Sequence, residues 1–72
     1  MLPMPSNVYK HIQLTGTSNT SMEDAIQGAI ARAAKTVRNM RWMEVLETRG
    51  SVENSRVSQW QVTIKVGFTL EE

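Results

Sequence analysis

The sequence of 72 residues contains no cysteine and only one histidine. It can therefore form no disulfide, zinc-thiolate site or iron–sulfur cluster. His11 alone could build a metal site only on a symmetry axis, so we predict none. Small domains usually need a disulfide, a metal or oligomerisation, because a chain of this size leaves roughly 40% of its unfolded surface exposed. Association with further copies of the same chain is the remaining route.

Long apolar runs and runs of basic residues are also missing. No stretch approaches the roughly 20 apolar residues of a membrane span, and residues 1–6 have neither the charged start nor the apolar run of a signal peptide. The formal net charge is +1, with acidic and basic residues interleaved. Such a chain has little attraction for nucleic acid or an anionic membrane. We expect a cytoplasmic protein that binds neither.

The chain shows no pattern of residues typical of catalysis. It has no nucleophile beside a base and no glycine-rich phosphate loop before a helix. We therefore predict no catalytic residues, and an enzymatic role would depend on a bound cofactor alone.

The N-terminal half predicts one strand followed by one helix. Pro3 and Pro5 indicate an extended or disordered leader over residues 1–6, so we expect a single domain over 7–72. Residues 8–14 alternate as a strand does, and the polar residues 15–21 indicate a turn.

The start of the helix is marked by Ser21 and Asp24, which approximate a capping box. Apolar residues then recur at spacings of three and four from Met22 to Met40. We expect one apolar stripe along a helix that covers a sheet.

The C-terminal half predicts two strands. Residues 41–49 form the first, with Gly50 as its end. By alternation one face carries Met43, Val45 and Glu47, and the other carries Trp42, Glu44, Leu46 and Thr48. After a connection at 51–55, residues 56–70 alternate without a break. At about 3.3 Å per residue this strand would span roughly 50 Å, so it must bend or pair with other subunits.

Together these elements predict an α+β fold with the order β-α-β-β, in which a three-stranded antiparallel sheet has one helix packed on one face. A single helix leaves the second face of the sheet uncovered. We expect Trp42 and Leu46 there and, if the hairpin register allows, Gln61, Thr63 and Lys65. This face is the candidate surface for association and ligand binding.

Seven short runs are informative together: Val8-Tyr9-Lys10, Leu14-Thr15-Gly16-Thr17-Ser18, Glu23-Asp24-Ala25-Ile26, Ala31-Arg32-Ala33-Ala34-Lys35-Thr36, Trp42-Met43-Glu44-Val45, Glu47-Thr48-Arg49-Gly50 and Gln61-Val62-Thr63-Ile64-Lys65-Val66-Gly67-Phe68. In their order and spacing they resemble the dodecins, which are small flavin-binding proteins. No single run is specific, but together they cover nearly the whole chain.

The resemblance implies a homododecamer of 23 symmetry that binds FMN or riboflavin in pairs at sites shared between subunits. It implies that Trp42 stacks on the flavin ring and that the amide of Gln61 hydrogen-bonds its polar edge. It places Arg49 near the ligand's side chain or phosphate, with Glu47 and Lys65 as further candidates. Without the resemblance, Trp42 would be interpreted as an interface or core aromatic, Gln61 as an exposed strand residue and Arg49 as a solvated charge or part of an inter-subunit salt bridge.

Two positions depart from the dodecin pattern. Trp60 stands where a tyrosine or another aromatic residue is typical, and by alternation it faces the helix and packs there. Thr69 stands where a basic residue often follows the phenylalanine, and a threonine cannot supply a charge to a phosphate. We expect a protein that stores flavin and limits its photochemistry. The alternative is a structural or interaction oligomer without a flavin ligand.

Overall fold

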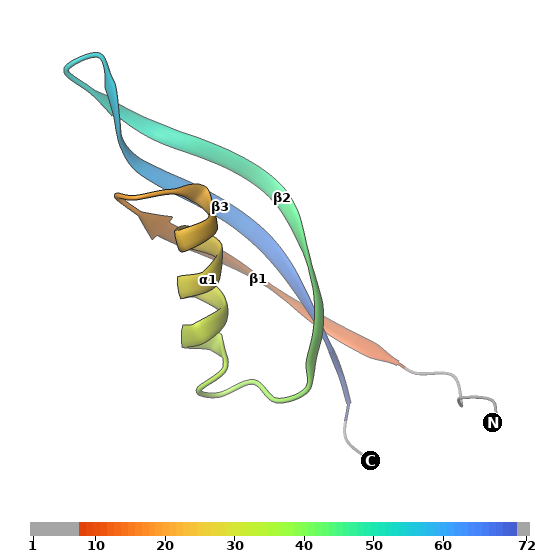
Figure 1. Cartoon of the computed structure of the whole chain (residues 1–72). Helices are drawn as coiled ribbons and strands as arrows, with labels where there is room; N and C mark the ends of the chain where they lie inside the picture. The colour runs from red at the N-terminus through yellow and green to blue at the C-terminus, as the bar shows by residue number, and fades with distance from the viewer. Residues whose placement is uncertain (1–7, 71–72) are drawn as a thin grey trace.

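The computed structural model describes residues 8–70, which form a three-stranded antiparallel sheet and one helix (Figure 1). The elements are β1 (Tyr9–Ser18), α1 (Met22–Ala33), β2 (Met40–Glu53) and β3 (Arg56–Thr69). The strand order is β1-β3-β2, so the last strand lies in the centre of the sheet. The predicted α+β fold and the order β-α-β-β are confirmed. The predicted leader, residues 1–6, lies outside the described residues.

The helix begins where the capping pattern predicts. The hydroxyl of Ser21 accepts a hydrogen bond from the backbone N–H of Asp24 at 3.0 Å. The second half of the capping box does not form, because the Asp24 carboxylate instead accepts a hydrogen bond from the hydroxyl of Ser18 at 2.7 Å. Ser18 is buried at the end of β1, so this bond ties the first turn of α1 to the strand before it.

The helix ends earlier than its apolar stripe. It stops at Ala33, although the stripe continues through Val37 to Met40. Asn39 has a φ of 63°, a left-handed conformation that reverses the chain into β2. Met40 is therefore the first residue of β2, and it packs against the core from the sheet rather than from the helix. Helical spacing alone does not show whether Met40 ends the helix or begins the next strand, because its side chain packs against the core in either case.

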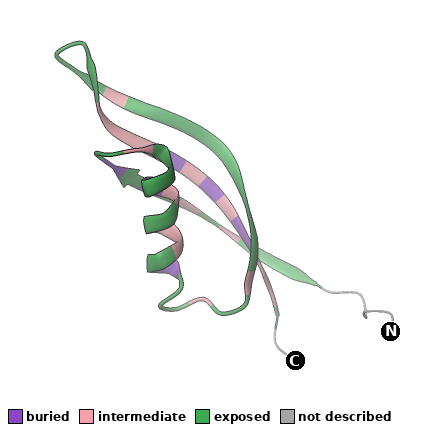
Figure 2. Ribbon diagram, viewed as in Figure 1, coloured by how far each residue is buried: buried purple, intermediate pink, exposed green. Residues whose placement is uncertain are grey.

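The core is thin and lies between α1 and the centre of the sheet. Val62, Ile64 and Val66 alternate along β3 and are fully buried, together with Ala25 of α1. Figure 2 shows these buried residues along β3, whereas β2 is exposed along nearly its whole length. The helix packs on β1 and β3 and makes at most slight contact with β2.

The hairpin of β2 and β3 is longer than predicted. Gly50 was expected to end the strand, but β2 continues through it to Glu53. The turn is only Asn54-Ser55, with φ values of 52° and 63° that suit a tight two-residue hairpin. Gly50 has no left-handed backbone, and a Cβ atom there would lie 3.0 Å from Cγ1 of Val57, so here glycine makes room for a neighbour rather than ending a strand. The described chain measures 57 × 21 × 19 Å.

Candidate functional site on the open face

The register of β2 against β3 is interrupted by β-bulges. One lies between Met40 and Trp42, and another lies between Val45 and Glu47, where Leu46 is the extra residue. Since a bulge inserts one residue without a partner, the side chains beyond it change face. Alternation alone placed Glu47 with Val45 and placed Thr48 with Trp42, and both placements are wrong beyond the bulge.

The bulge at Leu46 brings the predicted site residues to one side of the sheet. Glu47 pairs with Thr63 and Arg49 pairs with Gln61, while Thr48 pairs with the buried Val62. Directly paired residues of antiparallel strands share a face. We call the side opposite α1, which carries Gln61, Thr63, Lys65 and Gly67 of β3, the open face. Trp42, Glu47, Arg49, Gln61 and Lys65 all belong to it.

One end of the open face is aromatic. Trp42 pairs with Gly67, and its indole ring lies against that glycine. Tyr9 of β1 meets the same indole edge-on, with ring centroids 6.1 Å apart and ring planes at 63°. Trp42 keeps 39% of its surface exposed, so part of the indole is open to a ligand.

The other end of the open face is polar. A guanidinium nitrogen of Arg49 forms an ion pair with the carboxylate of Glu47, and both side chains are more than half exposed. Exposed pairs of this kind contribute only about 0–1 kcal/mol, so Arg49 can exchange this partner for a ligand at small cost. The amide of Gln61 donates a hydrogen bond to the side-chain oxygen of Gln59 at 3.3 Å.

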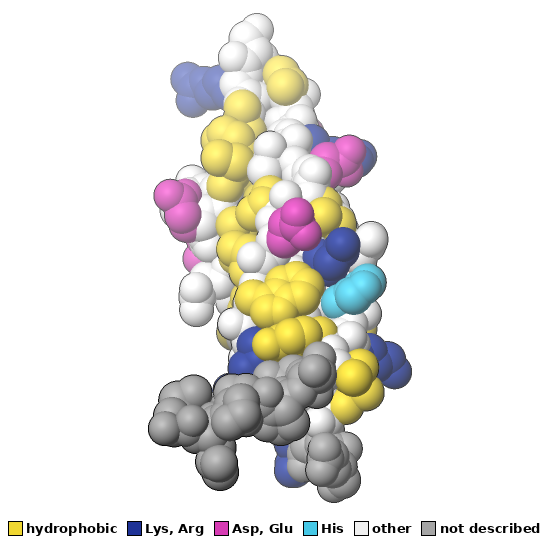
Figure 3. Space-filling view, turned by 90° about the vertical axis from the view of Figure 1, so that its right-hand side faces the viewer, with side chains coloured by type: hydrophobic (Ala, Val, Ile, Leu, Met, Phe, Trp, Pro, Cys, Tyr) yellow, Lys and Arg dark blue, Asp and Glu magenta, His cyan; other side chains and the backbone are white. Residues whose placement is uncertain are grey.

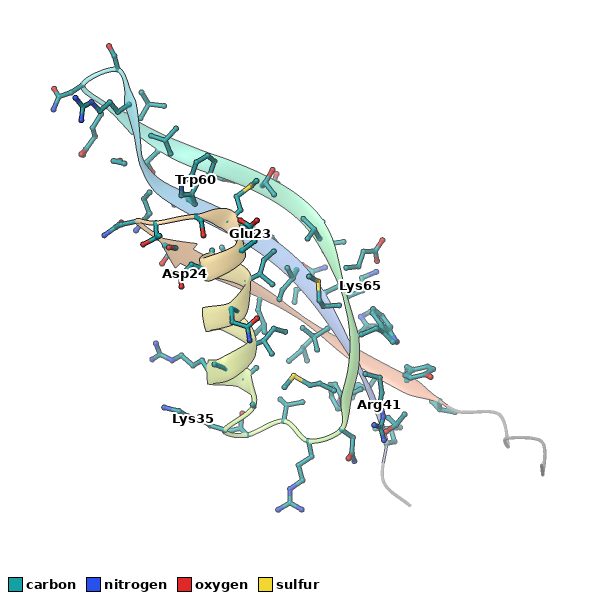
Figure 4. All side chains as sticks on the ribbon, in the orientation of Figure 1. Glu23, Asp24, Lys35, Arg41, Trp60 and Lys65 are labelled. Atoms are coloured by element: carbon teal, nitrogen blue, oxygen red, sulfur yellow. The ribbon has the colours of Figure 1, made fainter. Side chains whose placement is uncertain are left out.

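Lys65 lies between the two ends. Its ammonium nitrogen is 4.0 Å from a carboxylate oxygen of Glu44, and its side chain is 29% exposed. In Figure 4, Lys65 lies away from the helix, whereas Trp60 lies near the first turn of α1, as alternation predicts. Figure 3 shows hydrophobic side chains beside the histidine on one face, with basic and acidic groups farther along it.

The structure does not bring Trp42 and Gln61 together within one chain. Six positions of β3 separate Gln61 from Gly67, the partner of Trp42, which at about 3.3 Å per residue is roughly 20 Å. An extended glutamine side chain spans only about a quarter of that gap. A hollow of about 320 Å³, lined by Val37, Phe68 and Thr69 among others, contains none of the predicted site residues. One flat ligand can meet both side chains only if they come from different subunits.

Sequence reasoning missed two residues of the aromatic end. These residues are Tyr9 and Gly67, and the sequence analysis gave neither a role. The available signal was a glycine in the interior of a strand, which often marks the close approach of another group.

Among residues 8–70, no group of three histidine or acidic side chains lies close enough together to hold a metal ion. Within the same residues, no helix has the length and apolar character needed to cross a bilayer.

The structure thus defines the class of protein. It is a β-α-β-β subunit with one uncovered sheet face, and that face has an aromatic end and a polar end. The dodecin family model matches residues 8–71. A dodecin from Thermus thermophilus is 51% identical over 65 residues, which cover 90% of this chain and 94% of that protein. The chain belongs to the dodecin family.

Other relatives agree in fold, and one of them is named for calcium. The dodecin of Streptomyces coelicolor superimposes with a TM-score of 0.89 at 39% identity, covering 96% of this chain and 99% of that one. The calcium dodecin of Mycobacterium tuberculosis is 33% identical over 64 residues, covering 89% of this chain and 90% of that protein. Its crystal structure has a calcium-binding site and superimposes with a TM-score of 0.77, covering 89% of this chain and 91% of that one.

Proposed function

We propose that the protein is a flavin-storage protein, in which a homododecamer holds FMN or riboflavin stacked on Trp42 between subunits. The observation that carries this proposal is the placement of Trp42 on the open face. One side of its indole lies against Gly67, and 39% of its surface is exposed. A flat aromatic ligand stacked on such a ring gains the offset contact that aromatic pairs favour.

The polar end supplies what the rest of a flavin requires. The amide of Gln61 has two donors and an acceptor, and it can match the adjacent carbonyl and N–H groups of the flavin's pyrimidine edge. Arg49 lies opposite Gln61 and can reach the ribityl chain or a phosphate. Because these groups lie roughly 20 Å from Trp42, a complete site combines the aromatic end of one subunit with the polar end of another.

The need for assembly is supported by apolar side chains that the single chain leaves uncovered. Met43 and Val45 lie on the helix side of β2, where α1 makes at most slight contact, and their exposures are 41% and 43%. The buried core is also small for an elongated chain. Covering such a strip with further copies of the chain removes apolar surface from water, at roughly 25 cal/mol per Å².

Storage fits this arrangement better than turnover. A flavin stacked between aromatic groups has both ring faces covered, whereas redox catalysis requires a substrate to reach one of them. Trp42 in van der Waals contact with the ring can quench its excited state by electron transfer. Bound flavin should therefore bleach more slowly in light than free flavin.

Titration of riboflavin or FMN with apoprotein tests the proposal. We expect flavin fluorescence to fall as apoprotein is added and to reach a plateau at a sub-stoichiometric ratio of flavin to protein chains. The Trp42→Ala variant should bind flavin far more weakly while remaining assembled. Trp60→Phe is the matched control, because Trp60 lies on the helix side. Unchanged fluorescence with wild-type protein would instead indicate an oligomer without a flavin ligand.

A separate assay tests storage against catalysis. Flavin-loaded protein is mixed with NADH under anaerobic conditions and then exposed to oxygen. We expect no multiple turnovers. Sustained NADH consumption that depends on the protein would contradict storage and favour an oxidoreductase.

A further inference from the structure

Gly67 is in unusually close contact with the indole of Trp42. A Cβ atom at position 67 would lie 2.1 Å from both Cε2 and Cζ2 of that ring and 2.7 Å from Nε1. Carbon atoms in contact are about 3.5–4.0 Å apart, so any side chain at this position would overlap the ring. The glycine does not have a positive φ, so backbone conformation gives no reason for it.

The three separations show which part of the ring meets Gly67. A group approaching the Cε2–Cζ2 bond within the plane of the indole would come closer to Nε1 than to either carbon. The nitrogen is instead the most distant of the three atoms. Gly67 therefore lies beneath the face of the indole, and the ring rests flat on the β3 backbone.

Two neighbouring features also hold the indole ring of Trp42 in this position. The bulge at Arg41 sets the register in which Trp42 lies opposite Gly67, and Tyr9 meets the indole edge-on from β1. The ring is thus supported from below and from one side. The flavin-stacking surface is then formed in the chain before any ligand arrives, which lowers the ordering cost of binding.

We infer that Gly67 is a positioning residue for flavin, because the absence of a side chain there sets the plane of the Trp42 ring. The inference depends on the proposed function for its ligand but not for its geometry. A methyl group at position 67 would push the ring outward by roughly 1.5 Å. Because the indole is the partly exposed end of a side chain, the ring can move without unfolding the sheet.

The test is Gly67→Ala, examined in a Trp60→Phe background so that Trp42 is the sole tryptophan. In the apoprotein we expect a changed near-UV circular dichroism signal and stronger acrylamide quenching of Trp42. For riboflavin we expect about tenfold weaker binding, the amount that aromatic pairing geometry contributes beyond the buried area. Gly28→Ala is the matched control, because a methyl group there meets nothing within 4 Å.

A double variant separates positioning from a general effect on the fold. If Gly67 acts only through the ring, then Gly67→Ala should cause no further loss of riboflavin affinity once Trp42→Ala is present. Should Gly67→Ala alone fail to assemble, Trp42→Ala should restore assembly by removing the overlapping ring. Absence of that rescue would overturn the inference.

The remaining outcomes are equally distinct. Unchanged Trp42 spectra in Gly67→Ala, or wild-type affinity for riboflavin, would refute the role of Gly67 even if flavin storage is correct. If wild-type protein binds neither riboflavin nor FMN, the proposed function fails. The Trp42 spectra of the apoprotein still decide whether Gly67 sets the position of the indole ring.

Discussion

Mixed assemblies of two binding-defective chains should recover flavin binding. One chain carries Trp42→Ala, and the other carries Gln61→Ala. The first loses the stacking partner, at about 2–4 kcal/mol for an aromatic anchor. The second loses hydrogen bonds to the flavin edge, at about 1–3 kcal/mol if that edge is left unpaired. Neither chain alone should hold flavin at concentrations that nearly saturate the wild-type protein.

The size of the recovery follows from the roughly 20 Å between the two ends of the open face. If a site takes Trp42 from one subunit and Gln61 from its neighbour, random mixing of equal amounts gives about a quarter of sites with both residues intact. If one chain supplied both residues, no site would be intact, because neither variant carries both.

A second mixture makes the test independent of losses during preparation. Wild-type chains are mixed with the double variant Trp42→Ala, Gln61→Ala and assembled in the same way. Shared sites again predict about a quarter of sites intact, whereas sites within one chain predict about half. Flavin bound per chain is measured by fluorescence quenching after each mixture is purified as an assembly. Equal binding in the two mixtures supports shared sites, and no binding in the first with ample binding in the second would refute them.

Three further predictions concern the scaffold and the choice of flavin. Gly16→Ala should lower the free energy of unfolding by about 1–3 kcal/mol, because its methyl group would lie 2.1 Å from the backbone oxygen of Ala25. Gly28→Ala has free space around its methyl group and should raise the free energy of unfolding by about 0.5–1 kcal/mol. Urea unfolding at equal chain concentration measures both changes. Ser21→Ala should cost about 1 kcal/mol by removing the helix cap, and Ser21→Asp, which keeps an acceptor, should cost little in the same assay. Thr69→Arg should strengthen FMN binding about tenfold through a charge-assisted bond to phosphate and leave riboflavin binding nearly unchanged, and an equal gain for both ligands in a fluorescence titration would contradict this reason.

The sequence predicts the elements of the fold because each has a local physical cause. The alternation along β3 reflects burial of one of its faces beneath α1, and Ser21 marks the helix start through a bond to the backbone N–H three residues later. Local patterns do not predict where the helix ends. Val37 and Met40 continue the apolar stripe because both remain partly buried, although one lies in a loop and the other in a strand.

The candidate site is only partly predictable, and the bulge at Leu46 is the reason. Strict alternation assigns Glu47 to the helix side, while the extra residue in β2 returns it to the open face beside Arg49. A bulge depends on how two strands pair over distance, and nothing in the run around Leu46 marks it. The contact between Gly67 and the indole of Trp42 cannot be predicted from the sequence for the same reason, because the two residues meet only through the register of two strands.

Size-exclusion chromatography with light scattering, monitored also in the flavin absorbance band, tests the central claim most directly. After incubation with riboflavin or FMN, we expect a particle of about 97 kDa, twelve times the chain mass of 8.1 kDa, that carries flavin absorbance. The Trp42→Ala variant should elute at the same mass without that absorbance. A wild-type monomer of 8.1 kDa, or an assembly that elutes free of flavin, would contradict a flavin site shared between subunits.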